Sequence, residues 1–135
     1  MANYKRLFMN YMDREGIKYT DRGEFRVRVA YNGDNLKTIP VIVDFDKDGD
    51  PMVQFHCWEI ANFKDKFAAG VLACNILNAK YRWVKFYIDD DKDVVCSVDA
   101  YIDEINCGSE CLALVRRVVN ITDEAYPIFM KALFV

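Results

Sequence analysis

The sequence has little of what marks the common catalytic sites. Its 135 residues include three Pro, one His and six Gly that all stand singly. It contains no Gly-rich phosphate-binding loop, no Gly-x-Ser-x-Gly and no helix motif with two His residues. These absences exclude the best-marked enzyme classes and predict a protein without a catalytic site. An enzyme that uses scattered carboxylates leaves no such signature and stays an alternative class.

Segments that separate domains or enter membranes are also missing. There is no internal repeat, no low-complexity tract and no linker, so residues 1–135 are expected to form one domain. The first residues contain no apolar stretch of the roughly 7–15 residues that a signal peptide needs. No apolar run approaches the ~20 residues of a membrane span. We therefore expect a cytoplasmic protein that does not enter a membrane.

Positive charge is scarce and scattered. The 18 Lys and Arg are outnumbered by 21 Asp and Glu, which gives a net charge of −3. A nucleic-acid-binding protein carries a basic patch or stripe, and none is visible, so no nucleic-acid partner is expected. The five Cys are odd in number and four of them lie in apolar segments, which predicts reduced, buried thiols and not a disulfide framework.

The apolar residues make up 53% of the chain, and their spacing predicts its elements. A 3-4-3-4 spacing from Tyr4 to Met12 is typical of an amphipathic helix, whereas apolar and basic residues alternate from Phe25 to Tyr31, as in a half-buried strand. The expected helices span 2–15, 63–79 and 108–134. The expected strands span 17–20 (short), 25–31, 38–45, 51–59, 82–89 and 93–102.

Two of the expected helices have further features. The middle of 63–79 is almost wholly apolar, so this helix is expected to be buried on most sides. The last third of the chain is expected to divide near Asn120–Thr122 into two helices, with Pro127 early in the second.

The order of these elements predicts an α+β fold. The first three long strands are joined by connections too short for a parallel crossover, so they form an antiparallel meander. The expected architecture is a single antiparallel sheet of about five strands, in the order α-β-β-β-α-β-β-α, with the helices packed on one face. The other face of the sheet would then be open in the monomer.

Three stretches of the sequence carry a resemblance to a known family. They are Val43–Asp46 leading through a Gly turn into Met52–Phe55; Asn75–Asn78 followed by the hairpin from Trp83–Asp89 to Ser97–Asp99; and Ala125–Met130. With these stretches the chain resembles the YbjN family of bacterial proteins, which are described as sensory-transduction regulators. The resemblance implies a fold like that of the type III secretion chaperones and a non-enzymatic binding role. It implies no catalytic residue and no particular partner.

The segment Asp44–Gly49 is the sharpest local pattern. It has the Asp residues and the Gly of the first half of an EF-hand calcium loop. The twelfth position, where the loop needs a bidentate Glu, is Phe55. The flanking segments are expected to be strands, so a Gly-bearing hairpin turn is the favoured interpretation. Asp89–Asp93 is interpreted in the same way, and a weak divalent-cation site at either turn is the alternative.

The Cys residues are candidates for nucleophilic or metal-binding chemistry. His56 and Cys57 are adjacent on an expected strand, where neighbours point to opposite faces and cannot pair. Cys107 and Cys111 stand four apart at the head of a helix, without the further ligands that a zinc site needs. All are interpreted as packing residues, and no cofactor or metal is expected.

The open sheet face is the better candidate for function. Strand parity places several Trp, Tyr and Arg side chains there, which are the types that dominate binding hot spots. The candidate partner-binding residues are Arg28, His56, Trp58, Trp83, Tyr87 and Tyr101. A solvated sheet with scattered aromatic residues is the competing interpretation. We expect a protein-binding module of chaperone, adaptor or regulatory type, with a protein partner or a second copy in a homodimer. The alternative is a small-molecule sensor or small enzyme with a pocket between the helices and the sheet.

Overall fold

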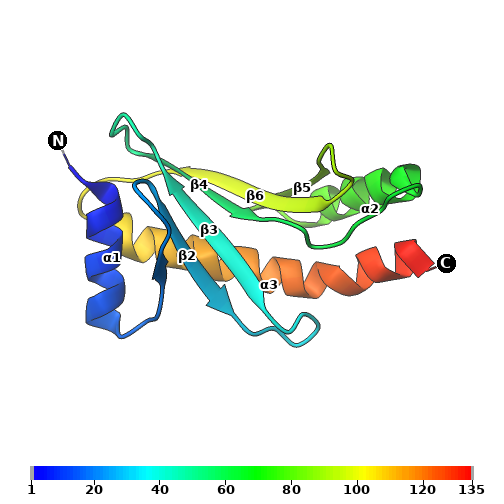
Figure 1. Cartoon of the computed structure of the whole chain (residues 1–135), viewed down its shortest axis with the longest axis horizontal. Helices are drawn as coiled ribbons and strands as arrows, with labels where there is room; N and C mark the ends of the chain where they lie inside the picture. Colours follow the sequence, from blue (N-terminus) through cyan, green and yellow to red (C-terminus); the bar gives the residue numbers. More distant parts are fainter. Residues whose placement is uncertain (1, 135) are drawn as a thin grey trace.

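A computed structural model describes residues 2–134 of the chain. Within them it has three helices and six strands (Figure 1). In chain order these are α1 (Tyr4–Glu15), β1 (Thr20–Asp21), β2 (Arg26–Tyr31), β3 (Ile39–Phe45), β4 (Met52–Cys57), α2 (Phe67–Lys80), β5 (Lys85–Ile88), β6 (Val94–Tyr101) and α3 (Cys107–Phe134). None of these helices is long and apolar enough to cross a membrane.

The strands form one open antiparallel sheet in the order β1-β2-β3-β4-β6-β5. The first four follow one another as a meander. The chain then leaves the sheet through α2 and returns with a hairpin whose second strand, β6, pairs with β4. The α+β class with one antiparallel sheet is therefore confirmed, and the two-residue β1 is the sixth strand.

One face of the sheet is buried under α3. Residues alternate along the central strands, and the buried set includes Val41 and Val43 of β3 and Val53 and Phe55 of β4. The opposing apolar residues of α3 include Val115, Val118 and Phe129. Figure 1 shows α3 running along the molecule behind β2 and β3, with α1 at one end and α2 at the other. We call the buried side the inner face and the opposite side the outer face.

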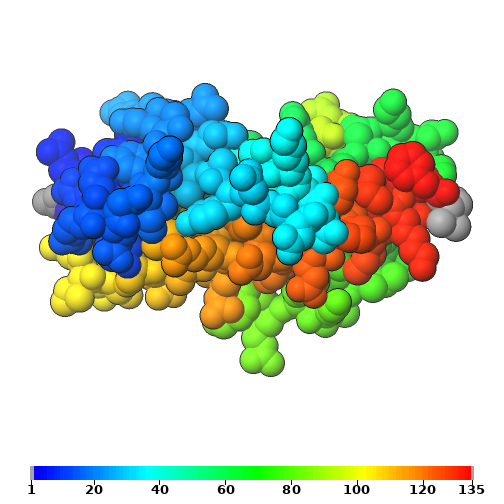
Figure 2. Space-filling view, turned by 90° about the horizontal axis from the view of Figure 1, so that it is seen from below, coloured from blue at the N-terminus to red at the C-terminus, as the bar shows by residue number. Residues whose placement is uncertain are grey.

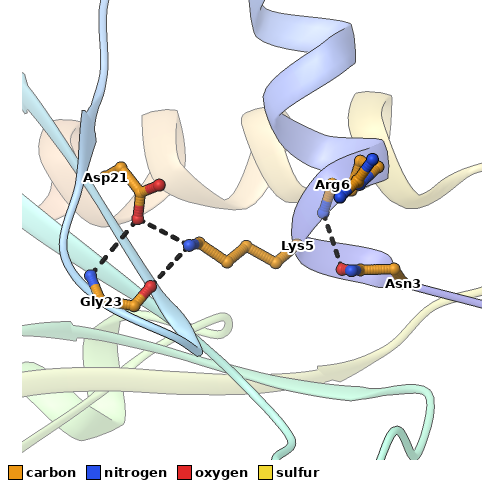
Figure 3. A network of polar contacts seen from close by, with 5 residues as sticks. All are labelled: Asn3, Lys5, Arg6, Asp21 and Gly23. Atoms are coloured by element: carbon orange, nitrogen blue, oxygen red, sulfur yellow. Dashed lines mark hydrogen bonds and ion pairs between the residues drawn. The ribbon is translucent and has the colours of Figure 1, made fainter.

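The N-terminal helix is tied to the β1–β2 hairpin. Asn3 caps α1 by accepting a hydrogen bond from the Arg6 backbone N–H at 3.0 Å (Figure 3). The ammonium of Lys5 lies 2.6 Å from the Asp21 carboxylate and donates to the Gly23 carbonyl at 2.5 Å. One side chain of α1 thus holds the end of β1 and the turn that follows it.

The second helix is far more exposed than expected. Its buried residues are Gly70, Ala73, Cys74 and Leu77, whereas several large apolar side chains on its other side are exposed. The prediction that this helix is buried on most sides is wrong. The reason is its place: α2 packs along one side against the edge strand β5 and α3, and its other side has no neighbouring element among residues 2–134.

A side chain of α2 occupies the edge of β5. The amide of Asn78 accepts a hydrogen bond from the Phe86 N–H at 2.7 Å and donates to the Phe86 carbonyl at 3.0 Å. These are the two bonds that another strand would make at this position.

The third helix is unbroken from Cys107 to Phe134, so the predicted division near residues 120–122 is wrong. Pro127 lies inside it and cannot donate to the carbonyl of Asp123 four residues earlier. That carbonyl instead accepts a hydrogen bond from the Asn35 side-chain amide at 3.0 Å. A contact from the β2–β3 loop therefore satisfies the group that the Pro leaves free, and the helix continues.

Asp123 also anchors the β2–β3 loop, through its side chain. The Asp123 carboxylate accepts hydrogen bonds from the backbone N–H groups of Asp34, Asn35 and Leu36 at 2.8–2.9 Å. These bonds lower the pKa of Asp123. In Figure 2 the cyan residues of this loop lie directly against the orange and red atoms of α3.

We predict that Asp123→Asn lowers the free energy of unfolding by about 1–2 kcal/mol, because the neutral amide is a weaker acceptor for three N–H groups. The pKa of Asp123 in the folded state lies below its ordinary value of 3.8. The charged carboxylate therefore makes its full contribution to stability above about pH 3.8. The contribution is lost as the pH falls through the lowered pKa. Urea unfolding from pH 7 to pH 3 should therefore show a difference between the two proteins that shrinks below about pH 4. The exposed turn carboxylate Asp90, changed to Asn, is the control, and an equal effect there would contradict the assignment.

Candidate functional site on the outer sheet face

The outer face is built by the residues that alternate with the core. Strand register brings five of them into one row across the sheet: Arg28, Ile42, His56, Ser97 and Lys85. A second row contains Arg26, Asp44, Gln54 and Asp99. Each row carries charged and neutral side chains contributed by four or five different strands.

Trp58 lies over this face although it follows the end of β4. Its ring stacks on the His56 ring with centroids 5.3 Å apart and planes 12° from parallel. The Arg26 guanidinium lies 5.6 Å from the indole centroid and pairs with the Asp44 carboxylate at 3.3 Å. These contacts hold the indole in one orientation while 40% of Trp58 stays exposed.

His56 is half-buried in the middle of the face. Its Nδ1 atom is buried and has no hydrogen-bond partner among residues 2–134. Burial lowers the pKa of His56, and the nearby carboxylates of Asp44 and Asp99 oppose this shift. At neutral pH the ring is therefore mainly uncharged, which suits its stacking on Trp58.

Two depressions border the stacked pair. One has a volume of about 450 Å³ and is lined by Arg22, Arg26, Arg28, Pro40, Ile42, Trp58 and Glu59. The other has a volume of about 430 Å³ and is lined by Gln54, His56, Lys85, Tyr87, Ser97 and Asp99. Each combines apolar or aromatic carbon with charged groups, so the face offers contacts to apolar and polar side chains of a partner.

Five of the six candidate partner-binding residues lie on this face. Arg28, His56, Trp58 and Tyr87 lie near the two depressions. Tyr101 lies opposite Met52 at the other end of β4 and is 79% exposed.

Trp83 is the exception, and the prediction that it lies on the outer face is wrong. Strand β5 begins only at Lys85, so the alternation assumed from residue 82 does not reach Trp83. Its ring lies 4.6 Å from the guanidinium carbon of Arg117 in α3 and belongs to the helix layer. Arg22 lines the depression beside Trp58 but is not among the predicted residues. It follows the two-residue strand β1, which is too short to give a strand pattern.

The acidic residues that follow β3 and β5 form turns, as predicted. Asp46 accepts hydrogen bonds from the N–H groups of Asp48 and Asp50, and Gly49 has φ of 83°, which a turn with left-handed backbone requires. In the β5–β6 turn, oxygen atoms of Asp89, Asp91 and Asp93 lie within 4.8 Å of one another. One Asp89 oxygen accepts the N–H groups of the other two residues and so closes the turn.

The Cys residues are packing groups. Cys57 lies on the inner face directly opposite Cys96, so it points away from His56. All five thiols are free and buried. Cys107 and Cys111 lie in the first turns of α3, where the Cys107 Sγ is 3.4 Å from the Tyr4 carbonyl oxygen. The hydrogen bond with the Cys111 thiol lowers the pKa of the Cys107 thiol, which is fully buried in the core.

Burial raises the pKa of Cys57 and of Cys96 to about 12. A thiol alkylates as its thiolate, which is scarce at pH 8 when the pKa is so high. We predict that iodoacetamide at pH 8 leaves both residues unlabelled in the folded protein and labels both in 6 M guanidinium, as read by peptide mass spectrometry. Rapid labelling of Cys57 in the folded protein would contradict this assignment and reopen a nucleophilic role.

Comparisons with known proteins give a consistent family and fold. The YbjN family model, described as "Putative bacterial sensory transduction regulator", matches residues 7–127. A crystal structure of YbjN from E. coli, described as a "putative transcription regulator", is similar with a TM-score of 0.63. It is 13% identical, and the alignment covers 93% of this chain and 89% of that one.

A second similar structure is the Yersinia pestis type III secretion chaperone SycH, in complex with a stable fragment of YscM2. Its TM-score is 0.50 at 12% identity, with 88% of this chain and 99% of that chain covered. No curated protein gives a significant sequence match.

Proposed function

Because the chain belongs to the YbjN family and shares its fold with a type III secretion chaperone, we propose that it is a non-enzymatic protein-binding module of chaperone, adaptor or regulatory type. The outer sheet face is the proposed binding surface. The observation that carries the proposal is the stacked arrangement of Arg26, Trp58 and His56 on an open sheet. Trp and Arg are the residue types that most often dominate binding energy, and here they are held in position before any partner arrives.

The packing of the interior favours this proposal over a sensor or small enzyme with a pocket between the helices and the sheet. The space between α3 and the sheet is occupied by fully buried side chains, among them Val41, Phe55, Val115, Val118 and Phe129. The five free thiols are consistent with the cytoplasm as the place where the protein works. The net charge of −3 supports a protein partner over a nucleic acid.

The two Trp residues lie on different layers and provide a matched test. We predict that Trp58→Ala lowers affinity for a protein partner at least about tenfold, whereas Trp83→Ala leaves it within about twofold. The measurement is affinity capture from cells of the source organism with quantitative mass spectrometry, followed by titration with the purified partner. Both variants must first show a folded circular-dichroism spectrum. Loss of the partner with Trp83→Ala alone would move the site to the helix layer.

Self-association is the second part of the proposal, and α2 is its proposed surface. Four large side chains on its outward side are exposed, namely Phe67, Val71, Leu72 and Ile76. The only charged residue of the helix is Lys80 at its last position. A two-fold dimer places one surface against its own copy, and a mainly apolar surface, with the Lys92 ammonium over the Phe67 ring at one end, can do so with little like-charge repulsion. An apolar helix side of this extent is typical of an interaction site.

We predict that the wild-type protein has the mass of a dimer by light scattering and that Ile76→Glu converts it to a monomer. A carboxylate on the α2 surface would be buried beside its own copy, which costs several kcal/mol. Ile105→Glu is the matched control, since Ile105 is 97% exposed outside α2 and should leave the dimer intact. A monomeric wild-type protein at 100 µM, a concentration at which a dimer of about micromolar affinity would form, would contradict the proposal.

A further inference from the structure

The depression beside Trp58 has an unusual combination of residues. Its base contains Pro40 and Ile42 of β3, and the Trp58 indole forms one wall. Three Arg residues of the β1–β2 segment also line it, Arg22, Arg26 and Arg28. This concentration of positive charge stands out in a chain with a net charge of −3.

The three Arg residues differ in what they contact. Arg26 is engaged with the Asp44 carboxylate and the Trp58 ring, so its role is to position the indole. The ion pairs within residues 2–134 include neither Arg22 nor Arg28. Their guanidinium groups are therefore available to bind a carboxylate, which they can do through two parallel N–H donors. Glu59 is the one carboxylate that lines the depression.

The backbone at Arg22 is held in place before a ligand binds. The residue lies between Asp21 and Gly23, and Lys5 of α1 binds both of these neighbours (Figure 3). The Arg22 backbone N–H also donates to the Arg26 carbonyl at 3.0 Å. A segment anchored in this way loses little conformational entropy when its side chain engages a ligand.

We infer that this depression binds an acidic segment of the partner protein, in which a bulky apolar residue is flanked by Asp or Glu. The apolar side chain packs on Pro40 and Ile42 against Trp58, and the flanking carboxylates bind Arg22 and Arg28. An inorganic anion would leave the apolar base without a contact, whereas an uncharged peptide would leave the two guanidinium groups without a partner. The inference rests on the proposed protein-binding function and specifies the chemistry of the partner.

The test begins with a random seven-residue peptide display library selected on the folded full-length protein. Selected peptides are synthesised with a fluorescent label, and their affinities are measured by anisotropy. We expect enrichment of Asp and Glu beside Leu, Phe or Trp, and affinity that falls as the salt concentration rises from 50 to 300 mM.

Charge-matched variants assign the site. Arg22→Gln/Arg28→Gln should weaken binding about tenfold, whereas Arg14→Gln/Arg82→Gln, which removes the same charge elsewhere, should change it less than about twofold. Glu59→Gln should tighten binding about twofold, because it removes the opposing carboxylate. Thermal unfolding of each variant checks that it is folded.

Three results would overturn the inference: no selected peptide, selected peptides without acidic residues, or equal binding by the Arg22/Arg28 variant and the wild type. A different result would refute the proposed function itself, namely that Trp58→Ala still binds the captured partner. A partner that is lost with Trp58→Ala but retained by the Arg22/Arg28 variant would preserve the binding face and refute the acidic segment.

Discussion

Burial of one sheet face beneath a single long helix is the constraint on which the molecule depends. Alternate residues of β2, β3 and β4 supply the sheet side of this contact, and α3 supplies the other. An interrupted helix could not cover the sheet along its length. The contact of Asn35 with the Asp123 carbonyl is therefore important, because it satisfies the backbone group that Pro127 leaves without a donor.

The same constraint creates the functional surface. All three helices are engaged with the inner face or with the ends and edge of the sheet, so the second face keeps its side chains for other contacts. Those side chains are ordered by contacts with one another, as in the arrangement of Asp44, Arg26, Trp58 and His56. The binding function proposed here thus uses a surface that is organised without taking part in the core.

The parts of this structure that could be predicted are those with a local pattern. Period-two alternation in β2, β3 and β4 predicts both the strands and their outward residues, including Arg28 and His56. The exposure of α2 could not be predicted, since an apolar helix has the same sequence whether a core or another molecule covers it. Trp83 was misplaced because strand parity holds only inside a strand, and β5 begins after it. Arg22 could not be predicted because its backbone is positioned by Lys5, which is far away in the sequence and binds the neighbouring Asp21.

The side-chain amide of Asn78 has a consequence for how copies of this chain can accumulate. Polymerisation through sheet edges requires two open edges on every subunit, one to join the preceding copy and one to recruit the next. Here the outward backbone groups of Phe86 are already satisfied within the molecule. A strand joining the β5 edge would have to displace this amide, so the β1–β2 side is the more accessible edge, and a pair joined there has no second such edge to offer. The Asn78 amide thus opposes growth of the sheet from one molecule to the next at β5, beside a helix that exposes much apolar surface.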